Sequence, residues 1–419
     1  MEDEKLSIAH FSWEYPPRMV GGLGTFATEL TRKFTEHGHK ITVFTLNDGN
    51  KFKPSEEWRG ITVHRPMITN LTKPLDVITN SELQSWGRGL KFFSDIFSYN
   101  TLSASKLVND LVRQRGYHFD VLHSHDWLGI IGGVISKDEL DLPLVFHVHS
   151  TEFGRSLGGG SRTVADLEKM GYENADVVIT VSNAMKRELE SLGMRGKTEV
   201  CWNGVDPSKY DPSKINKDKL KALRQRYGLK DTDLVVFFVG RLVEVKGVDK
   251  LVRAFSHVAS KVPNAKLVIL GTGGMQDKLV RLAEDLGISS KVIFRFEFVP
   301  EEERILHYAL ADVAVFPSLY EPFGIVCTEA MSMQVPVVVG AKGTSGLAEQ
   351  IIDSGPEQCG RHANPWSIDD LASKIIEILE MTPEERMRLG ENGRNRVLKE
   401  FTWESVYNRI LDIYRRVAR

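Results

Sequence analysis

Two glutamates, Glu321 and Glu329, stand eight residues apart in the segment PSLYEPFGIVCTEA, residues 317–330. Glu321 precedes a Pro-Phe-Gly turn, and Glu329 falls about two turns into the helix that we expect to start near Phe323. Carboxylates placed in this way can hold two separate hydroxyl-bearing parts of one ligand, while N–H groups of the helix start meet a group between them. The spacing disfavours a pair that shares one proton, and two surface carboxylates without a ligand are the alternative.

A pair of cations, Arg241 and Lys246, follows the apolar run 234–239. Arginine offers a planar fork of donors and lysine a point charge, so the two together suit a diphosphate. They can also stabilise the negative charge that develops on a departing phosphate. The alternative is a pair of solvated surface cations.

The segment Gly21-Gly22-Leu23 follows the first apolar run and opens a helix. Glycines allow close approach of a ligand, and a helix start presents N–H groups to an anion. A dinucleotide fingerprint is disfavoured because nine residues separate Phe11 from Gly21. Thr344 lies in a second loop of small residues that also leads into a helix. Glycine-rich turns without a ligand are the alternative.

Polar side chains follow two other apolar runs. Alternation along a strand places His123 and His125 on one face, and likewise His147 and His149. Asp126 comes directly after the first pair. Imidazoles and carboxylates supply the directional donors and acceptors that a sugar needs. A metal site and hydrogen-bonded core histidines are the alternatives, and we expect no metal because the fixed ligand spacing of known sites is absent.

Short apolar runs alternate with amphipathic stretches along the whole chain, which predicts an α/β protein with two doubly wound parallel sheets. The predicted strands are 6–11, 41–44, 121–123, 144–148 and 177–181 in the first half, and 234–239, 267–270, 292–294, 313–316 and 335–339 in the second. The predicted domains are 1–203 and 204–400, followed by a helix over 401–419. In open sheets of this kind, ligands bind at the carboxyl ends of the strands, where the residues above lie.

The composition excludes several classes of protein. With 54 Lys and Arg against 56 Asp and Glu, the chain has no basic excess, so nucleic acid is not expected as a partner. Its three cysteines are far apart, which argues against a disulfide framework and favours a reducing, cytoplasmic location. The acidic N-terminus is unlike a signal peptide, and no apolar run is long enough for a transmembrane segment.

Taken together, these motifs resemble the GT-B glycosyltransferases, specifically family 4 and the related glycogen and starch synthases. The motifs that carry the resemblance are the E-x7-E element 321–329, Val239-Gly240-Arg241-Leu242 with Lys246-Gly247, Gly21-Gly22-Leu23, His125-Asp126-Trp127, Thr180-Val181-Ser182 and Asn203-Gly204-Val205-Asp206. The resemblance implies two Rossmann-like domains with an interdomain cleft, 1–203 on the acceptor side and 204–400 binding the nucleotide sugar. It also implies that the terminal helix 401–419 crosses back to the first domain. One departure is Met19, where bacterial starch synthases have lysine before Gly-Gly-Leu, and it favours the broader family 4.

The resemblance also implies roles for individual residues and a metal-independent reaction without a cofactor. By this resemblance, the donor diphosphate is bound by Arg241 and Lys246, and the ribose by Glu329. The sugar hydroxyls are bound by Glu321 with the amides of Phe323, Gly324 and Ile325, and the phosphates are lined by Gly21, Gly22 and Leu23 with Thr344. The sugar and the acceptor are contacted by His149 and Asp126. UDP-glucose or ADP-glucose is the favoured donor.

The sequence therefore predicts a retaining hexosyltransferase that moves a hexose, with glucose favoured, from a nucleotide sugar to a hydroxyl acceptor such as an α-glucan. Two alternatives stay open: a sugar-nucleotide epimerase of the same fold and a non-enzymatic carbohydrate-binding protein. The base, the acceptor and the oligomeric state also stay open.

Overall fold

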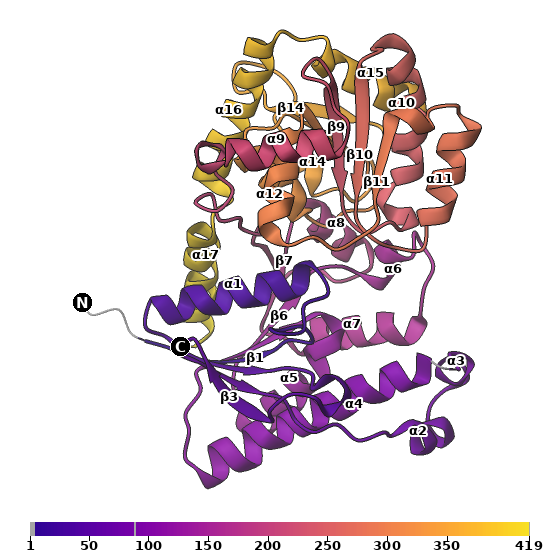
Figure 1. Cartoon of the computed structure of the whole chain (residues 1–419). Helices are drawn as coiled ribbons and strands as arrows, with labels where there is room; N and C mark the ends of the chain where they lie inside the picture. The colour runs from indigo at the N-terminus through magenta and orange to yellow at the C-terminus, as the bar shows by residue number, and fades with distance from the viewer. Residues whose placement is uncertain (1–4, 88, 419) are drawn as a thin grey trace. The chain divides into compact units, whose positions relative to one another are not determined.

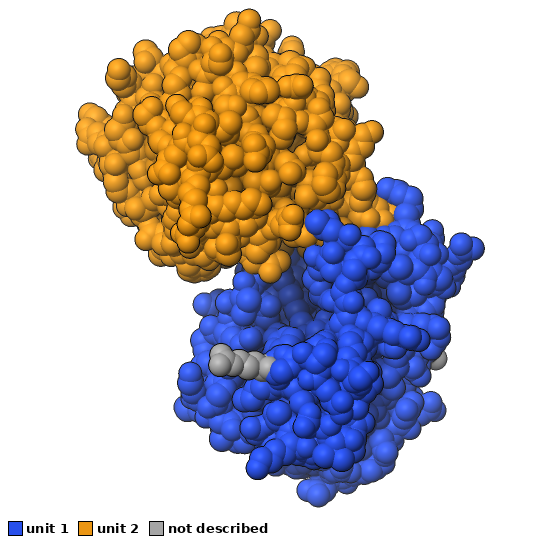
Figure 2. All heavy atoms as spheres, turned by 90° about the vertical axis from the view of Figure 1, so that its right-hand side faces the viewer, with its two compact units in different colours: residues 1–181, 186–202, 403–419 blue, residues 182–185, 203–402 orange. Residues whose placement is uncertain are grey.

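The computed structural model describes residues 5–87 and 89–418, so the predicted outer limits Met1 and Arg419 lie outside the described part (Figure 1). The chain divides into two compact units, which Figure 2 shows in blue and orange. Unit 1 comprises Met1–Val181, Lys186–Trp202 and Trp403–Arg419, and unit 2 comprises Ser182–Met185 and Asn203–Thr402. The sequence placed the boundaries at 203/204 and 400/401, and did not separate the four residues that begin at Ser182.

Unit 1 is built on one twisted sheet with the strand order β3-β4-β2-β1-β5-β6-β7-β8. All neighbouring strands are parallel except β3 and β4. The strands are β1 (Ser7–Phe11), β2 (Lys40–Phe44), β3 (Ser55–Trp58), β4 (Ile61–His64), β5 (Val121–His125), β6 (Leu144–Val148), β7 (Val177–Thr180) and β8 (Thr198–Val200). The register pairs His10 with His123 and His125 with His147, so that histidines of three adjacent strands lie side by side.

Helices cover both faces of this sheet. Helix α1 (Gly22–Glu36) packs with the terminal helix on one face, and α4 (Gly89–Ser105) packs with α5 (Asp126–Leu140) on the other (Figure 1). The remaining helices are α2 (Thr72–Ile78), α3 (Ser81–Ser85), α6 (Glu152–Arg155), α7 (Arg162–Asn174), α8 (Asn183–Ser191), which runs from one unit into the other, and a π-helical continuation of α4 over Lys106–Gln114.

The terminal helix α17 (Trp403–Val417) is part of unit 1, although the chain reaches it from unit 2. Its apolar face, which includes Ile410, is buried in the same core as α1 and the middle strands. The hydroxyl of Tyr407 lies 3.1 Å from His39 Nε2, and the hydroxyl of Tyr414 is hydrogen-bonded to His123. The predicted return of this helix to the first domain is therefore confirmed.

Unit 2 has a fully parallel sheet with the strand order β11-β10-β9-β12-β13-β14. Its strands are β9 (Leu234–Val239), β10 (Ala265–Leu270), β11 (Val292–Arg295), β12 (Val313–Phe316), β13 (Val337–Gly340) and β14 (Gly360–Ala363). Its helices are α9 (Lys217–Arg226), α10 (Val248–Lys261), α11 (Gln276–Asp285), α12 (Glu301–Leu310), α13 (Ile325–Ser332), α14 (Leu347–Gln350), α15 (Ile368–Leu379) and α16 (Pro383–Glu400). A core of α10, α11 and α15 side chains packs against one face of the sheet.

All ten predicted strands are present, and the prediction of two parallel α/β sheets is confirmed. The sequence missed β3, β4, β8 and β14, which lie at or next to sheet edges. Edge strands contact solvent on one side and lack the continuous apolar run of a central strand. Among the helices of the described residues, none combines the length and apolar character needed to cross a bilayer.

Candidate functional site

Lys246 is positioned by a turn that lies unusually close to a neighbouring loop. The turn follows β9, and Gly247 then starts α10 with a left-handed φ of 64°. A Cβ atom on Gly247 would lie 2.2 Å from the carbonyl oxygen of Pro317. The N–H of Leu319 donates to the carbonyl oxygen of Val245 at 2.8 Å. Only glycine permits this approach, which fixes the turn after β9 against the loop after β12.

This approach brings together two predicted site residues, Lys246 and Glu321. Their side chains form an ion pair and are 19% and 10% exposed, respectively. Ser318 Oγ also donates to Glu321 Oε2 at 3.2 Å. Glu321 neutralises part of the lysine charge, but an ammonium group has three N–H donors and retains others for a ligand.

The second predicted loop and the start of α13 join the same cluster. The N–H of Glu321 donates to the carbonyl oxygen of Thr344 at 3.1 Å, and the carbonyl of Glu321 accepts from Gly346 at 2.8 Å. Gly324 has a left-handed φ of 88° and ends the turn before α13. Within the described chain, the N–H groups of 323–325 have no hydrogen-bond acceptor. They therefore remain available to a ligand beside Glu321.

Arg241 follows β9 at the same end of the sheet and is exposed. In the described part of the chain its guanidinium has no hydrogen-bond or ion-pair partner. Because Lys246 is paired with Glu321 and Arg241 is not paired, the two predicted cations differ in the charge that each can offer to an anion.

Glu329 differs from the sequence expectation, because its carboxylate is buried and not openly presented to a ligand. The residue is 6% exposed. Its Oε1 accepts from the Tyr210 hydroxyl at 2.7 Å and from Arg304 Nη2 at 3.1 Å, and its Oε2 accepts from the Tyr308 hydroxyl at 2.7 Å. Burial and the nearby carboxylate raise the pKa of Tyr210, which therefore stays protonated as a donor.

The glycine-rich loop of unit 1 also differs from expectation, because an internal carboxylate occupies its N–H groups. Glu14 Oε2 accepts from the N–H groups of Val20, Gly21 and Gly24 at 3.1, 2.9 and 3.2 Å. Leu23 is buried in the core beneath the loop. The start of α1 is thus rigid and already holds a negative group, which limits its capacity for a phosphate.

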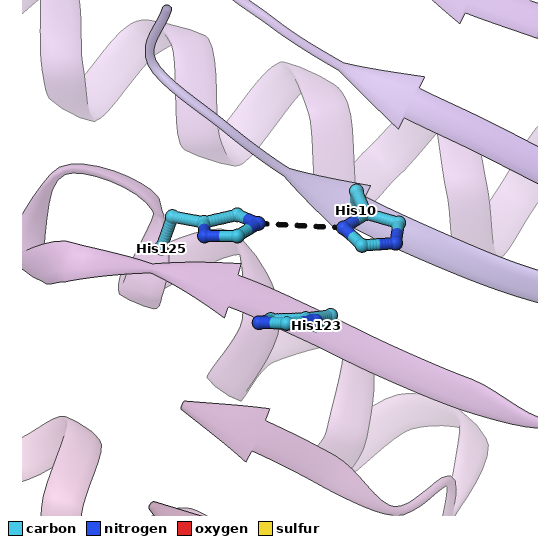
Figure 3. Close-up of side chains that lie close together, drawn as sticks. All are labelled: His10, His123 and His125. Atoms are coloured by element: carbon cyan, nitrogen blue, oxygen red, sulfur yellow. Dashed lines mark hydrogen bonds between the residues drawn. The ribbon is translucent and has the colours of Figure 1, made fainter. Parts of the chain in front are cut away.

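A row of five histidines lies on the face of the unit 1 sheet that α1 and α17 cover: His10, His123, His125, His147 and His149, of which the first four are buried. His10 Nδ1 lies 3.3 Å from His125 Nε2, and His125 Nδ1 lies 3.1 Å from His149 Nε2. Figure 3 shows the ring nitrogens of His10 and His125 facing each other, with His123 away from the line that joins them. Among these five, only His149 is partly exposed, and it follows the carboxyl end of β6.

These histidines are close enough to raise the question of a metal ion. In two groups, His10/His123/His125 and His125/His147/His149, the nearest ring nitrogens lie within 4.8 Å of one another. The rings, however, are stacked: His123 and His125 are inclined by 18°, and His147 and His149 by 12°. Imidazole binds a metal through a lone pair in the ring plane, and stacked planes do not direct these lone pairs to one point.

Asp126 has a strained backbone at the junction of β5 and α5. Its φ of 53° is left-handed, which is uncommon for a residue other than glycine. Its Oδ1 accepts from the N–H of His149 at 2.7 Å, so this contact joins the two predicted unit 1 site residues. Burial raises the pKa of the carboxyl group to about 6, against the opposing effects of Arg155 and the N–H donors.

A further acidic group, Glu168 on α7, lies below this site and was not predicted from the sequence. Its carboxylate accepts from the N–H of Glu152 at 2.8 Å and lies 3.7 Å from Arg155. Burial raises its pKa to about 8. Glu14, Arg304 and Tyr210 were missed as well, because none stands in a motif and each acts through a contact that only folding creates.

Comparisons of the sequence identify a family. The profile described as Glycosyltransferase Family 4 matches residues 20–209, and the one described as Glycosyl transferases group 1 matches residues 220–396. The chain is 31% identical to an uncharacterised glycosyltransferase of Methanocaldococcus jannaschii, with 98% of each chain covered. It is 28% identical to a glycogen synthase of Mycobacterium tuberculosis, with 98% of this chain and 94% of the relative covered.

Solved structures support the fold. A sucrose-phosphate synthase from Thermosynechococcus elongatus superposes with a TM-score of 0.77 at 23% identity, covering 98% of this chain and 99% of that one. The catalytic domain of starch synthase IV from Arabidopsis thaliana gives 0.75 at 19% identity, covering 99% and 100%.

The raised pKa of Glu168 predicts a pH-dependent loss of stability. Between the ordinary value of 4.5 and about 8, the folded protein holds a proton that the unfolded chain has released. The folded state is therefore destabilised as the pH rises through this window. Glu168→Gln removes this titration. From the lower to the upper end of the pH window, the free energy of unfolding of the variant minus that of wild type should therefore rise by about 2–4 kcal/mol.

Urea denaturation over this pH range measures the effect. Glu173→Gln, an exposed residue on the same helix, is the matched control and should follow wild type. Parallel curves for wild type and Glu168→Gln would show that the Glu168 carboxyl does not titrate as stated.

Proposed function

The chain belongs to the group 1 glycosyltransferases of family 4, and from this premise we propose that it transfers glucose from a nucleoside diphosphate glucose to a hydroxyl of an α-glucan, with retention of configuration. The observation that carries the proposal is the cluster of Lys246, Glu321, Thr344 and the unpaired N–H groups of 323–325 at the carboxyl ends of the unit 2 strands. The similarity to a glycogen synthase over nearly the whole chain supports glucose and a glucan.

Arg241 and Lys246 bind the diphosphate of the donor. Arg241 is exposed and without a partner among the described residues, so its guanidinium can bind phosphate oxygens in a bidentate manner. Lys246 is held by Glu321 at a fixed place and adds a point charge. Thr344 provides backbone close to the same anion, because its carbonyl oxygen accepts from the N–H of Glu321. Positive charge fixed before the reaction stabilises a departing diphosphate without reorganisation.

Glu321 takes hydroxyls of the transferred sugar, together with the amides of Phe323, Gly324 and Ile325. Its carboxylate is bonded to Lys246 and Ser318. These contacts lower its nucleophilicity, so we assign it to binding and not to a covalent intermediate.

The reaction then needs no protein base. The bond between the anomeric carbon and the diphosphate oxygen breaks, and the acceptor oxygen bonds to the same face of that carbon. The acceptor proton passes to the departing diphosphate oxygen, so atoms and charge balance. Asp126 and His149 orient the sugar and the acceptor, and either UDP or ADP is the released product.

The test of the proposed function is nucleotide release from a panel of UDP-, ADP- and GDP-sugars, each with and without an α-glucan primer. We expect release that depends on both a glucose donor and the primer, with an α-linked product. Formation of an isomeric nucleotide sugar without primer would instead show an epimerase, and glucan binding without turnover would show a binding protein.

Removing either cation should slow the chemical step. Arg241→Ala and Lys246→Ala should each lower kcat by an amount equivalent to about 2–4 kcal/mol, because each loses stabilisation of leaving-group charge. Arg253→Ala, which removes an exposed cation from α10, is the control and should match wild type. Single-turnover kinetics measure the step, and wild-type rates in both variants would eliminate the assigned role.

Glu329 should act on nucleotide affinity. Glu329→Gln keeps the shape and the acceptor for Tyr210 but loses the charge, so binding of UDP or ADP should weaken about tenfold if the carboxylate accepts ribose hydroxyls. Tyr308→Phe removes one internal donor while it keeps the carboxylate, and should bind nucleotide nearly as wild type. Calorimetric titration measures the nucleotide affinity of both variants and of wild type. If Glu329→Gln binds nucleotide as tightly as wild type, Glu329 has a structural role alone.

A further inference from the structure

Three imidazoles form a continuous hydrogen-bonded chain from the interior of unit 1 to its partly exposed surface. His10 Nδ1 meets His125 Nε2 at 3.3 Å, and His125 Nδ1 meets His149 Nε2 at 3.1 Å. His10 and His125 are fully buried, and His149 is partly exposed. The chain thus has a closed inner end and an outer end beside Asp126.

The sheet itself places the three rings. They come from β1, β5 and the residue after β6, which are adjacent strands in the sheet order. The ring of Phe26, on α1, packs in a T-shaped arrangement against the rings of His125 and His149, at centroid distances of 6.0 and 4.8 Å. An apolar cover of this kind excludes water from the links and disfavours charged rings. Burial accordingly lowers the pKa of His10 and of His149 to about 3 and that of His125 well below its ordinary value.

Neutral rings restrict the protons of the chain to two arrangements. Each ring carries one N–H, and each link needs one donor and one acceptor. In the outward arrangement His10 donates to His125, His125 donates to His149, and His149 is left with a proton on Nδ1. In the inward arrangement every link is reversed, and His149 Nδ1 is a bare acceptor.

The buried end selects between these arrangements. The inward arrangement puts a proton on His10 Nε2, an atom that is fully buried and has no acceptor among the described residues. The outward arrangement leaves that atom as a bare lone pair. A buried N–H without an acceptor is rarer and more costly than an unfilled acceptor, so the outward arrangement is favoured.

We infer that His10 and His125 are positioning residues that hold His149 as the Nδ1–H tautomer, so that it presents a hydrogen-bond donor to a ligand oxygen at the carboxyl end of β6. The identity of that oxygen as a sugar hydroxyl rests on the proposed function, whereas the tautomer does not. Among the three hydrogen-bonded rings, only His149 can contact a ligand, through its Nδ1, since the other two rings are fully buried.

His147 provides a matched comparison. It is fully buried on the same sheet face and stacks on His149 at a centroid distance of 4.2 Å. Both of its ring nitrogens lack a hydrogen-bond partner among the described residues. It therefore shares the packing of His125 but takes no part in the chain, so His147→Phe removes an imidazole without breaking a link.

The experiment uses the full chain labelled with 15N-histidine, in which the nitrogen shifts distinguish protonated from bare ring nitrogens. At neutral pH His149 should show Nδ1–H and a bare Nε2 in wild type and in His147→Phe. His125→Phe should give a mixture of both tautomers of His149. In steady-state assays kcat/KM for the nucleotide sugar should fall by about 3- to 10-fold in His125→Phe, the value of one hydrogen bond, and stay near wild type in His147→Phe.

The outcomes separate the inference from the proposed function. An Nε2–H tautomer in wild type would overturn the inference, as would equal shifts in His125→Phe and His147→Phe, or stoichiometric zinc whose removal by chelator changes the spectrum. The expected tautomers with unchanged kcat/KM would support the positioning role and reject the sugar contact. If His125→Phe does not fold, His10→Phe tests the same point, because it removes the ring that fixes the direction of the chain.

Discussion

The ion pair between Lys246 and Glu321 is the interaction on which the candidate site of unit 2 depends. The two residues lie 75 positions apart in the chain. They meet because Gly247 lets its turn approach the Pro317 carbonyl more closely than any side chain would allow. The pair fixes the ammonium group and holds the carboxylate beside the start of α13. Charge, helix N–H groups and backbone are therefore arranged before any ligand binds, which is what electrostatic stabilisation of a reaction requires.

The other carboxylates of the candidate sites are also held in place by internal hydrogen-bond donors. Glu14 accepts three N–H groups at the start of α1, and Asp126 accepts the N–H of His149. Glu329 accepts two tyrosine hydroxyls and a guanidinium. Burial outweighs the contacts of two carboxyl groups, and raises the pKa of Asp126 to about 6 and that of Glu168 to about 8. Hydrogen-bonded carboxylates hold their loops in place, and the two groups with a raised pKa lower the stability of the folded state when they ionise.

Local sequence patterns predicted most strands and several candidate site residues, but not the contacts that form between residues far apart in the sequence. Apolar runs identified the central strands and the edge strand β11, whereas β3, β8 and β14 carry polar residues and give no such signal. Motif spacing selected Glu321 and Lys246 but not their ion pair. It assigned Glu329 to a ligand and gave no sign of the hydrogen bond that its carboxylate accepts from Tyr210, 119 residues away. It expected bare N–H groups at Gly21, which a carboxylate seven residues earlier occupies.

The two units offer different chemistry at the carboxyl ends of their strands. Unit 2 supplies charge: the guanidinium of Arg241, with no partner among the described residues, and an ammonium group paired with one carboxylate. Unit 1 supplies neutral groups, since burial keeps the imidazoles uncharged. Cations attract any anion, whereas a neutral donor of fixed direction favours an oxygen at one place. The strand ends of unit 2 are therefore suited to an anion, and His149 of unit 1 to a directional hydrogen bond with an oxygen.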